Sequence, residues 1–138
     1  MDYVKISQET IGHLYKAHNS VRKSEIDTKL LALTDLRVSQ LNGCAYCCSF
    51  HSNEVREFGI QQDVLDKLAG WKTSSAFDEK QKLALDWAEA ITNMEADLSV
   101  YKKKLELVFS EKELVDLTAS ISIMNALNRL RITLGDNH

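Results

Sequence analysis

The sequence predicts an all-α fold, a single-domain helical bundle of about seven helices. The 138 residues include no proline and only five glycines, so the residues that most often interrupt helices are scarce. Apolar residues recur at the period of amphipathic helices in several long segments. The length suits one domain with one core, and no repeat, linker or low-complexity segment divides residues 1–138.

The apolar period places each helix in turn. In the first predicted helix it runs through Ile11, Leu14 and Tyr15, and in the last it runs from Leu114 to about Leu134. The expected helices cover residues 7–22, 27–41, 44–58, 61–71, 78–94, 98–109 and 111–134.

Capping signals support several of these boundaries. Residues 110–113 (SEKE) and 78–81 (DEKQ) match the capping box, in which two side chains bond the free backbone N–H groups of a first turn. Gly59 and Gly135 follow predicted helices and are expected to end them in the left-handed conformation that glycine adopts easily.

The composition is that of an ordinary globular protein, with 44% hydrophobic and 27% charged residues. A net charge of −3 argues against strong attraction to nucleic acid or to anionic membranes. The first ten residues lack the apolar core of a signal peptide, and no apolar run is long enough for a transmembrane helix. We therefore expect the cytoplasm, where a close cysteine pair indicates catalysis or metal binding more often than a structural disulfide.

All three cysteines lie in the run NGCAYCCSFH, residues 42–51. Gly43 can supply the bend between two helices, which places Cys44 near the start of the second. Because a helix advances about 100° per residue, Cys44, Cys47 and His51 share its apolar face. The thiols and the imidazole are therefore expected to point inward, so that their chemistry requires a pocket at the helix start.

This position favours a reactive thiolate. The helix N-terminus lowers the pKa of a nearby cysteine, and His51 lies one turn after Cys47, where an imidazole can accept the thiol proton. Cys44 lies one turn before Cys47, close enough for a disulfide. A thiolate that attacks a peroxide becomes a sulfenic acid, which condenses with a neighbouring thiol. The residues therefore favour a redox-active dithiol.

Other readings of the same residues remain open. Cys48 alone is expected to be a small buried hydrophobe. The CxxC spacing suits zinc, but ligands on one arc of one helix surround an ion poorly, so further ligands would have to come from His13, His18 or another subunit. Those two histidines are expected at the surface or an edge, and His138 at a frayed terminus. A non-catalytic redox sensor or interaction subunit is a further alternative.

The run LRVSQLNGCAYCCSFHSNEVREFG, residues 36–59, resembles the AhpD-like alkylhydroperoxidase family, which is grouped with the carboxymuconolactone decarboxylase-like fold. The runs LAGWKTSSAFDEKQKLALDWAEAIT and FSEKELVDLTASISIMNALNRL extend this resemblance from about Leu30 to Leu134. It implies small all-helical subunits that form trimers or hexamers. It also implies thiol-dependent peroxide or disulfide reduction, with electrons from a lipoyl-bearing or thioredoxin-like partner. The chemistry requires no organic cofactor, and we expect no metal.

The resemblance also implies a role for each member of the motif. Cys47 corresponds to the thiol that attacks peroxide, Cys44 to the thiol that resolves the sulfenic acid, and His51 to the base or thiolate partner. Tyr46 stands where the best-studied members carry a histidine.

One departure from the family concerns the proton relay. The family's relay begins with a glutamate twelve positions before the first cysteine, where this chain has Ala32. We therefore expect that His51 lacks its orienting acid, so that either Asp35 or Glu25 substitutes or turnover is slow. Of these two outcomes, slow turnover is the hypothesis. Arg37 and Asn128 match the family but are explained equally well by helix packing.

Overall fold

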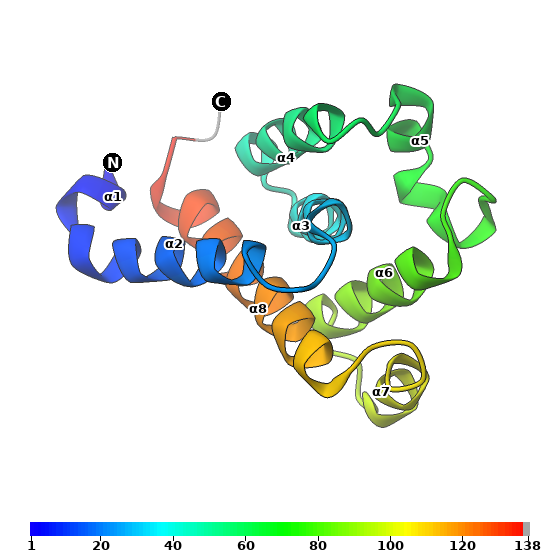
Figure 1. The fold of residues 1–138 in the computed structure, drawn as a ribbon. Helices are drawn as coiled ribbons and strands as arrows, with labels where there is room; N and C mark the ends of the chain where they lie inside the picture. Colours follow the sequence, from blue (N-terminus) through cyan, green and yellow to red (C-terminus); the bar gives the residue numbers. More distant parts are fainter. Residues whose placement is uncertain (137–138) are drawn as a thin grey trace.

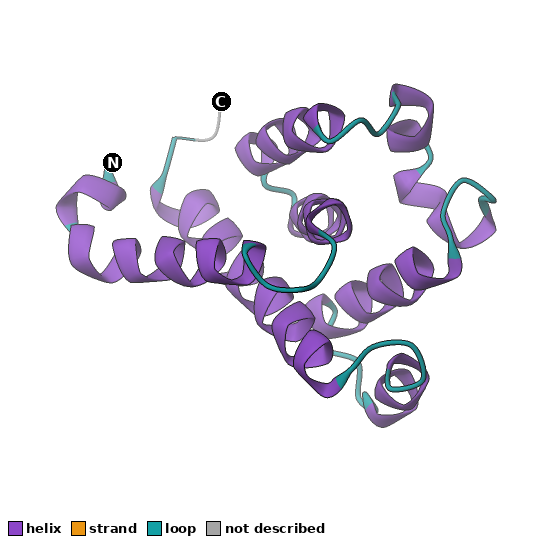
Figure 2. Ribbon diagram, in the orientation of Figure 1, coloured by secondary structure: helices purple, strands orange, loops and turns teal. Residues whose placement is uncertain are grey.

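The computed structural model of the chain describes residues 1–136 and is all-helical over that range. Figure 2 shows helices joined by short loops, with no strand in the part of the chain described. The predicted fold class is confirmed. The helices are α1 (Tyr3–Ile6), α2 (Gln8–Arg22), α3 (Thr28–Asn42), α4 (Ala45–Glu57), α5 (Gln62–Asp66), the 3-10 helix η1 (Leu68–Thr73), α6 (Glu79–Thr92), α7 (Ser99–Leu105) and α8 (Glu111–Leu134).

The long predicted helices are confirmed within a few residues, whereas the short ones differ from the prediction. The helix expected at 61–71 is two pieces, α5 and η1. Within η1, Gly70 lies outside helical geometry, with φ −110° and ψ 29°, so this segment is itself kinked. The helix expected at 98–109 ends at Leu105, and a turn follows that buries Phe109.

The capping signals are confirmed at two helix starts and at one of two glycine ends. Both capping boxes form, at the start of α6 and at the start of α8. Gly59 ends α4 with a φ of 90°, in the left-handed region. The expectation for Gly135 is wrong, because its φ of −86° and ψ of 174° are extended.

Helix α3 is the centre of the molecule. Figure 1 shows it end-on, with α4 above it, α6 to its lower right and α8 to its lower left, and it packs against all three. One apolar cluster joins it to α6, α7 and α8 around Leu31, Leu117 and Ile121. A second cluster joins it to α4, α5 and η1 around Leu33 and Val55. Because α3 is covered on several sides, it holds α4, which carries the cysteines, in a fixed position.

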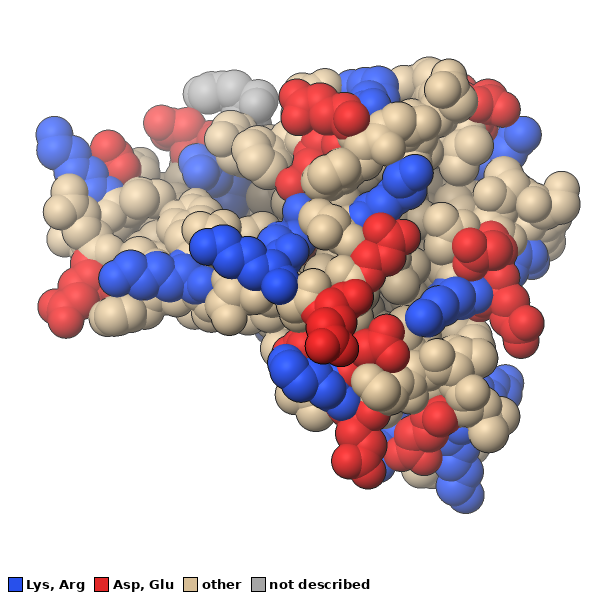
Figure 3. All heavy atoms as spheres, in the orientation of Figure 1, with Lys and Arg blue, Asp and Glu red and all other residues tan. Residues whose placement is uncertain are grey.

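The surface mixes both signs of charge. On the face drawn in Figure 3, acidic and basic side chains alternate with uncharged ones. Within residues 1–136, no helix combines the length and the apolar character needed to cross a membrane.

Candidate functional site

A disulfide joins Cys44 and Cys47 at the start of α4, with 5.2 Å between their Cα atoms. Gly43 ends α3 in the left-handed conformation, with a φ of 69°, and Cys44 then takes an extended conformation as the N-cap of α4. The backbone N–H of Cys47 donates a hydrogen bond to Cys44 Sγ over 3.3 Å. The first cysteine therefore occupies the place that a serine or aspartate oxygen often takes at a helix start.

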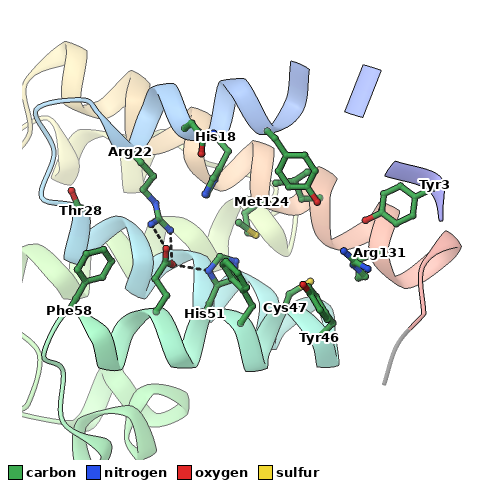
Figure 4. A pocket seen from close by; sticks show the side chains of 15 residues that line it. Tyr3, His18, Arg22, Thr28, Tyr46, Cys47, His51, Phe58, Met124 and Arg131 are labelled. Atoms are coloured by element: carbon green, nitrogen blue, oxygen red, sulfur yellow. Dashed lines mark hydrogen bonds and ion pairs between the residues drawn. The ribbon is translucent and has the colours of Figure 1, made fainter. Parts of the chain in front are cut away.

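The two sulfur-bearing residues differ in their access to solvent. Cys44 is fully buried, whereas Cys47 is 8% exposed and lines a cavity of about 510 Å³. Figure 4 shows this cavity between α2, α4 and the end of α8. Its lining residues are Tyr3, Tyr15, His18, Asn19, Arg22, Thr28, Tyr46, Cys47, Phe50, His51, Glu54, Phe58, Met124, Leu127 and Arg131. A small molecule in the cavity would meet Cys47 before Cys44.

His51 lies on the same face of α4, one turn after Cys47, and lines the same cavity. Its Nδ1 lies 3.0 Å from Glu54 Oε1. The expectation that His51 lacks an orienting acid is therefore wrong. The acid comes from the next turn of the same helix, and the spacing of His51 and Glu54 in the sequence was the signal that could have identified it.

Arg22, at the end of α2, joins Glu54 to a second carboxylate. Its Nη1 and Nη2 donate to the two oxygens of Glu54 over 2.7 and 3.0 Å. Its Nη2 also donates to Asp35 Oδ2 over 2.6 Å. Figure 4 shows Arg22 reaching from α2 toward the side of the cavity that holds His51. One cation thus compensates two carboxylates beside the histidine.

The charges in this network fix the state of the acid that contacts His51. Burial by itself raises the pKa of Glu54, but its hydrogen bonds from His51 and Arg22 and the charge of Arg22 outweigh burial and lower this pKa to about 2. Glu54 is therefore ionised at neutral pH, and its Oε1 accepts a hydrogen bond from the protonated Nδ1 of His51. In neutral imidazole the lone pair then lies on Nε2, which is free to act as a base.

The acids proposed as substitutes for the missing glutamate do not contact His51. Ala32 is fully buried in the apolar cluster that includes Val55. Asp35 is also fully buried and pairs with Arg22; burial raises its pKa, although the charge of Arg22 opposes this. Glu25 is exposed. Of these positions, only Asp35 is connected to the site, through Arg22.

The remaining histidines and the third cysteine differ in burial and in whether they line the cavity. His13 is exposed as expected, but His18 is half-buried and lines the cavity, and burial lowers its pKa. Cys48 is a half-buried free thiol whose pKa is raised by burial. His138 lies outside the described residues. Among residues 1–136, no group of three or more His, Cys, Asp or Glu side chains is placed to hold a metal ion.

Arg37 and Asn128 hold helices together. Arg37 donates through Nε to Glu89 Oε1 over 2.9 Å, and Trp71 Nε1 donates to the same oxygen over 2.8 Å. Asn128 is buried and donates to Ser39 Oγ over 3.1 Å. Neither residue lines the cavity of Cys47.

Comparison with known proteins finds solved structures of the same fold. A protein of unknown function from Agrobacterium tumefaciens, ATU0492, for which an AhpD role in antioxidant defence has been suggested, is 26% identical, with a TM-score of 0.90 over 100% of this chain and 98% of that one. The alkylhydroperoxidase AhpD core of a Ralstonia eutropha protein matches with a TM-score of 0.80 at 18% identity, over 95% of this chain and 71% of that one.

The sequence comparisons agree. The uncharacterized protein YdfG of Bacillus subtilis is 27% identical over 139 aligned positions, which cover 99% of this chain and 94% of YdfG. Residues 8–90 match the carboxymuconolactone decarboxylase family. The resemblance seen in the cysteine motif is thus confirmed: the chain belongs to the carboxymuconolactone decarboxylase family and has the AhpD-like fold.

Proposed function

We propose that this protein is a thiol-dependent peroxidase in which Cys47 reduces the peroxide. The observation that supports this most directly is the unequal placement of the two sulfurs. Cys47 lines the cavity together with His51, while Cys44 is buried behind it and bonded to it. This arrangement suits a thiol that meets substrate and a second thiol that meets only the first.

The first half of the cycle oxidises Cys47. In the reduced protein, His51 Nε2 accepts the Cys47 proton, and the thiolate attacks one peroxide oxygen. The O–O bond breaks, Cys47 becomes a sulfenic acid, and the leaving alkoxide takes the proton from the imidazolium to form an alcohol. Glu54 keeps Nδ1 protonated and holds the ring in place, which leaves Nε2 for this transfer.

The second half of the cycle forms and then reduces the disulfide. The Cys44 thiolate attacks the Cys47 sulfur, and the sulfenic oxygen leaves as water after gaining a proton. The N–H that reaches Cys44 Sγ at the helix start stabilises this thiolate. A dithiol donor then returns two electrons and two protons to the pair. We propose a lipoyl-bearing or thioredoxin-like protein as that donor and the cytoplasm as the compartment that keeps it reduced.

We further propose that the protein forms a homo-oligomer, a trimer or a hexamer. Tyr46 and Phe50 on α4 line the rim of the cavity and are 43% and 52% exposed, and Phe58 is also exposed. Aromatic side chains at this level of exposure are typical of interface residues. Light scattering at tens of micromolar should give the mass of a trimer or hexamer, and a monomer would contradict the proposal.

The decisive experiment is steady-state reduction of cumene hydroperoxide with dihydrolipoamide as electron donor. Cys47→Ser should abolish turnover. Cys44→Ser should lose turnover but still form one sulfenic acid per chain, and the control Cys48→Ser should retain most activity. The proposal is wrong if Cys47→Ser keeps the wild-type rate. A wild-type protein that oxidises once and does not turn over would instead be a redox sensor.

A further inference from the structure

The cavity has a second functional group, the guanidinium of Arg131 in the last turn of α8. Its central carbon lies 4.2 Å from the centre of the Tyr46 ring and 5.4 Å from the centre of the Tyr3 ring. Tyr46 directly precedes Cys47 in the chain, so the cation lies at the sulfur end of the cavity. Figure 4 shows Arg131 beside Tyr46 at this end, away from the network of Arg22.

Arg131 differs from Arg22, the other arginine that lines the cavity, because no carboxylate in the described part of the chain neutralises its charge. Arg22 pairs with both Asp35 and Glu54. The neighbours of Arg131 within residues 1–136 are aromatic rings, and no carboxylate in that part of the chain lies within ion-pair distance of it. The cavity therefore contains one balanced charge network and one cation without a matching anion among the described residues.

The contacts of Arg131 leave its hydrogen-bonding edge available. Stacking on an aromatic ring uses the flat face of a guanidinium. The N–H groups lie along the edge, in a geometry that matches a carboxylate through two parallel hydrogen bonds. The two tyrosines thus orient the group and leave its donors for a ligand.

The rest of the cavity suits an apolar molecule. Phe50, Phe58, Met124 and Leu127 contribute to its wall, and its volume of about 510 Å³ falls within the range of sites for small organic ligands. Hydrogen peroxide, which is close to water in size, would leave most of this space unused. An apolar body with one anionic group matches the wall and the cation together.

We propose that Arg131 binds a carboxylate on the substrate, so that the preferred substrate is an organic hydroperoxide with an apolar body and an anionic group. This proposal rests on the peroxidase function above. The reacting hydroperoxide lies at Cys47, and the carboxylate lies at Arg131. A charge-assisted pair of this kind should raise kcat/KM about 10- to 100-fold over that of a matched neutral substrate.

The kinetic test compares cumene hydroperoxide with its para-carboxylate derivative, which differs only in the charged group. Wild type should prefer the carboxylate. Arg131→Met, which keeps an apolar stem, should bring the two kcat/KM values within about twofold of each other. The matched control is Arg129→Met, on the same helix, because Arg129 is exposed and does not line the cavity. It should retain the preference.

A binding test separates this proposal from the peroxidase function. Calorimetry on the disulfide form should give a Kd for phenylbutyrate about tenfold or more below that of phenylbutanol, and this difference should vanish in Arg131→Met. If that variant does not fold, added salt must weaken phenylbutyrate binding in wild type while leaving phenylbutanol binding unchanged. Equal Kd values for the two ligands in wild type would overturn the anion site, whereas inactivity toward cumene hydroperoxide with a preserved Kd difference would overturn only the peroxidase function.

Discussion

Replacing Glu54 with glutamine keeps the shape of the side chain but removes the charge next to His51. The two carboxylate oxygens accept three hydrogen bonds, two from Arg22 and one from His51 Nδ1. A glutamine has one acceptor oxygen, so its NH₂ group must face a donor of Arg22 or of His51. Either the guanidinium moves away, or the imidazole takes the tautomer in which Nε2 carries the proton. In the second case Nε2 cannot accept the proton of Cys47.

The size of the effect follows from these contacts. Hydrogen bonds to charged groups contribute about 1.5–3 kcal/mol, and the Glu54 side chain is 20% exposed, which places the value in the lower part of that range. We expect the rate constant for oxidation of reduced Cys47 to fall about 10- to 40-fold, because each factor of ten corresponds to about 1.4 kcal/mol.

Stopped-flow oxidation of the pre-reduced protein by cumene hydroperoxide measures this rate constant without the electron donor. Glu57→Gln is the matched control, since it removes an exposed carboxylate from the same helix, and it should react as wild type does. A Glu54→Gln protein that has the wild-type melting temperature and reacts within about twofold of wild type would refute the role given to Glu54.

Further predictions concern substitutions at Ala32 and Asp35 and the dependence of stability on pH. Ala32→Glu should lower the free energy of unfolding by about 2 kcal/mol or more, because the new carboxylate enters a closed apolar cluster. It should not raise the peroxidase rate, because His51 already contacts Glu54. Urea unfolding and the same stopped-flow assay test this, and a faster enzyme would contradict it. Asp35→Asn should cost about 1–2 kcal/mol in urea unfolding, because Arg22 loses one buried carboxylate partner but keeps Glu54. A wild-type midpoint would contradict that cost. The pKa of Glu54 is about 2 in the folded protein and about 4.3 in an unfolded chain. Its contribution to stability is therefore complete above the unfolded value and is lost as the pH falls toward the folded one. Glu54→Gln should accordingly lose less stability than wild type between those two pH values, measured by urea unfolding, and parallel curves for the two proteins would contradict the assignment.

The parts of the fold that the sequence predicts well are those with local signals. The capping boxes at Asp78 and Ser110 act within one turn, and both form as expected. The break between α5 and η1 has no comparable signal, because it depends on how Leu68 and Trp71 reach the second apolar cluster. Those contacts involve helices distant in the sequence, so periodicity within one segment does not reveal them.

In the candidate site, too, the sequence predicts the features that depend on one helix and misses those that depend on the packing of several helices. Cys44, Cys47 and His51 come together because they lie on one face of one helix, which the sequence shows directly. Arg22 and Arg131 enter from α2 and α8, and the packing of these helices around α3 and α4 is a tertiary property. Sequence reasoning therefore identified the cysteines and the histidine of the candidate site but missed the two arginines that line the same cavity.

One cysteine of the pair is placed to be stabilised as a thiolate, and the other is placed to meet a molecule in the cavity. Cys44 receives the helix-start hydrogen bond and is closed off from solvent. Cys47 borders the cavity and lies one turn from His51. A buried thiol with an N–H donor can ionise without meeting peroxide, which suits the thiol that attacks a sulfenic acid next to it. A thiol at the cavity wall with an adjacent base meets peroxide first. In the peroxidase cycle proposed above, the order of the two steps follows from where α4 begins, because the N-cap position buries the sulfur of Cys44 and the next turn brings that of Cys47 to the cavity wall.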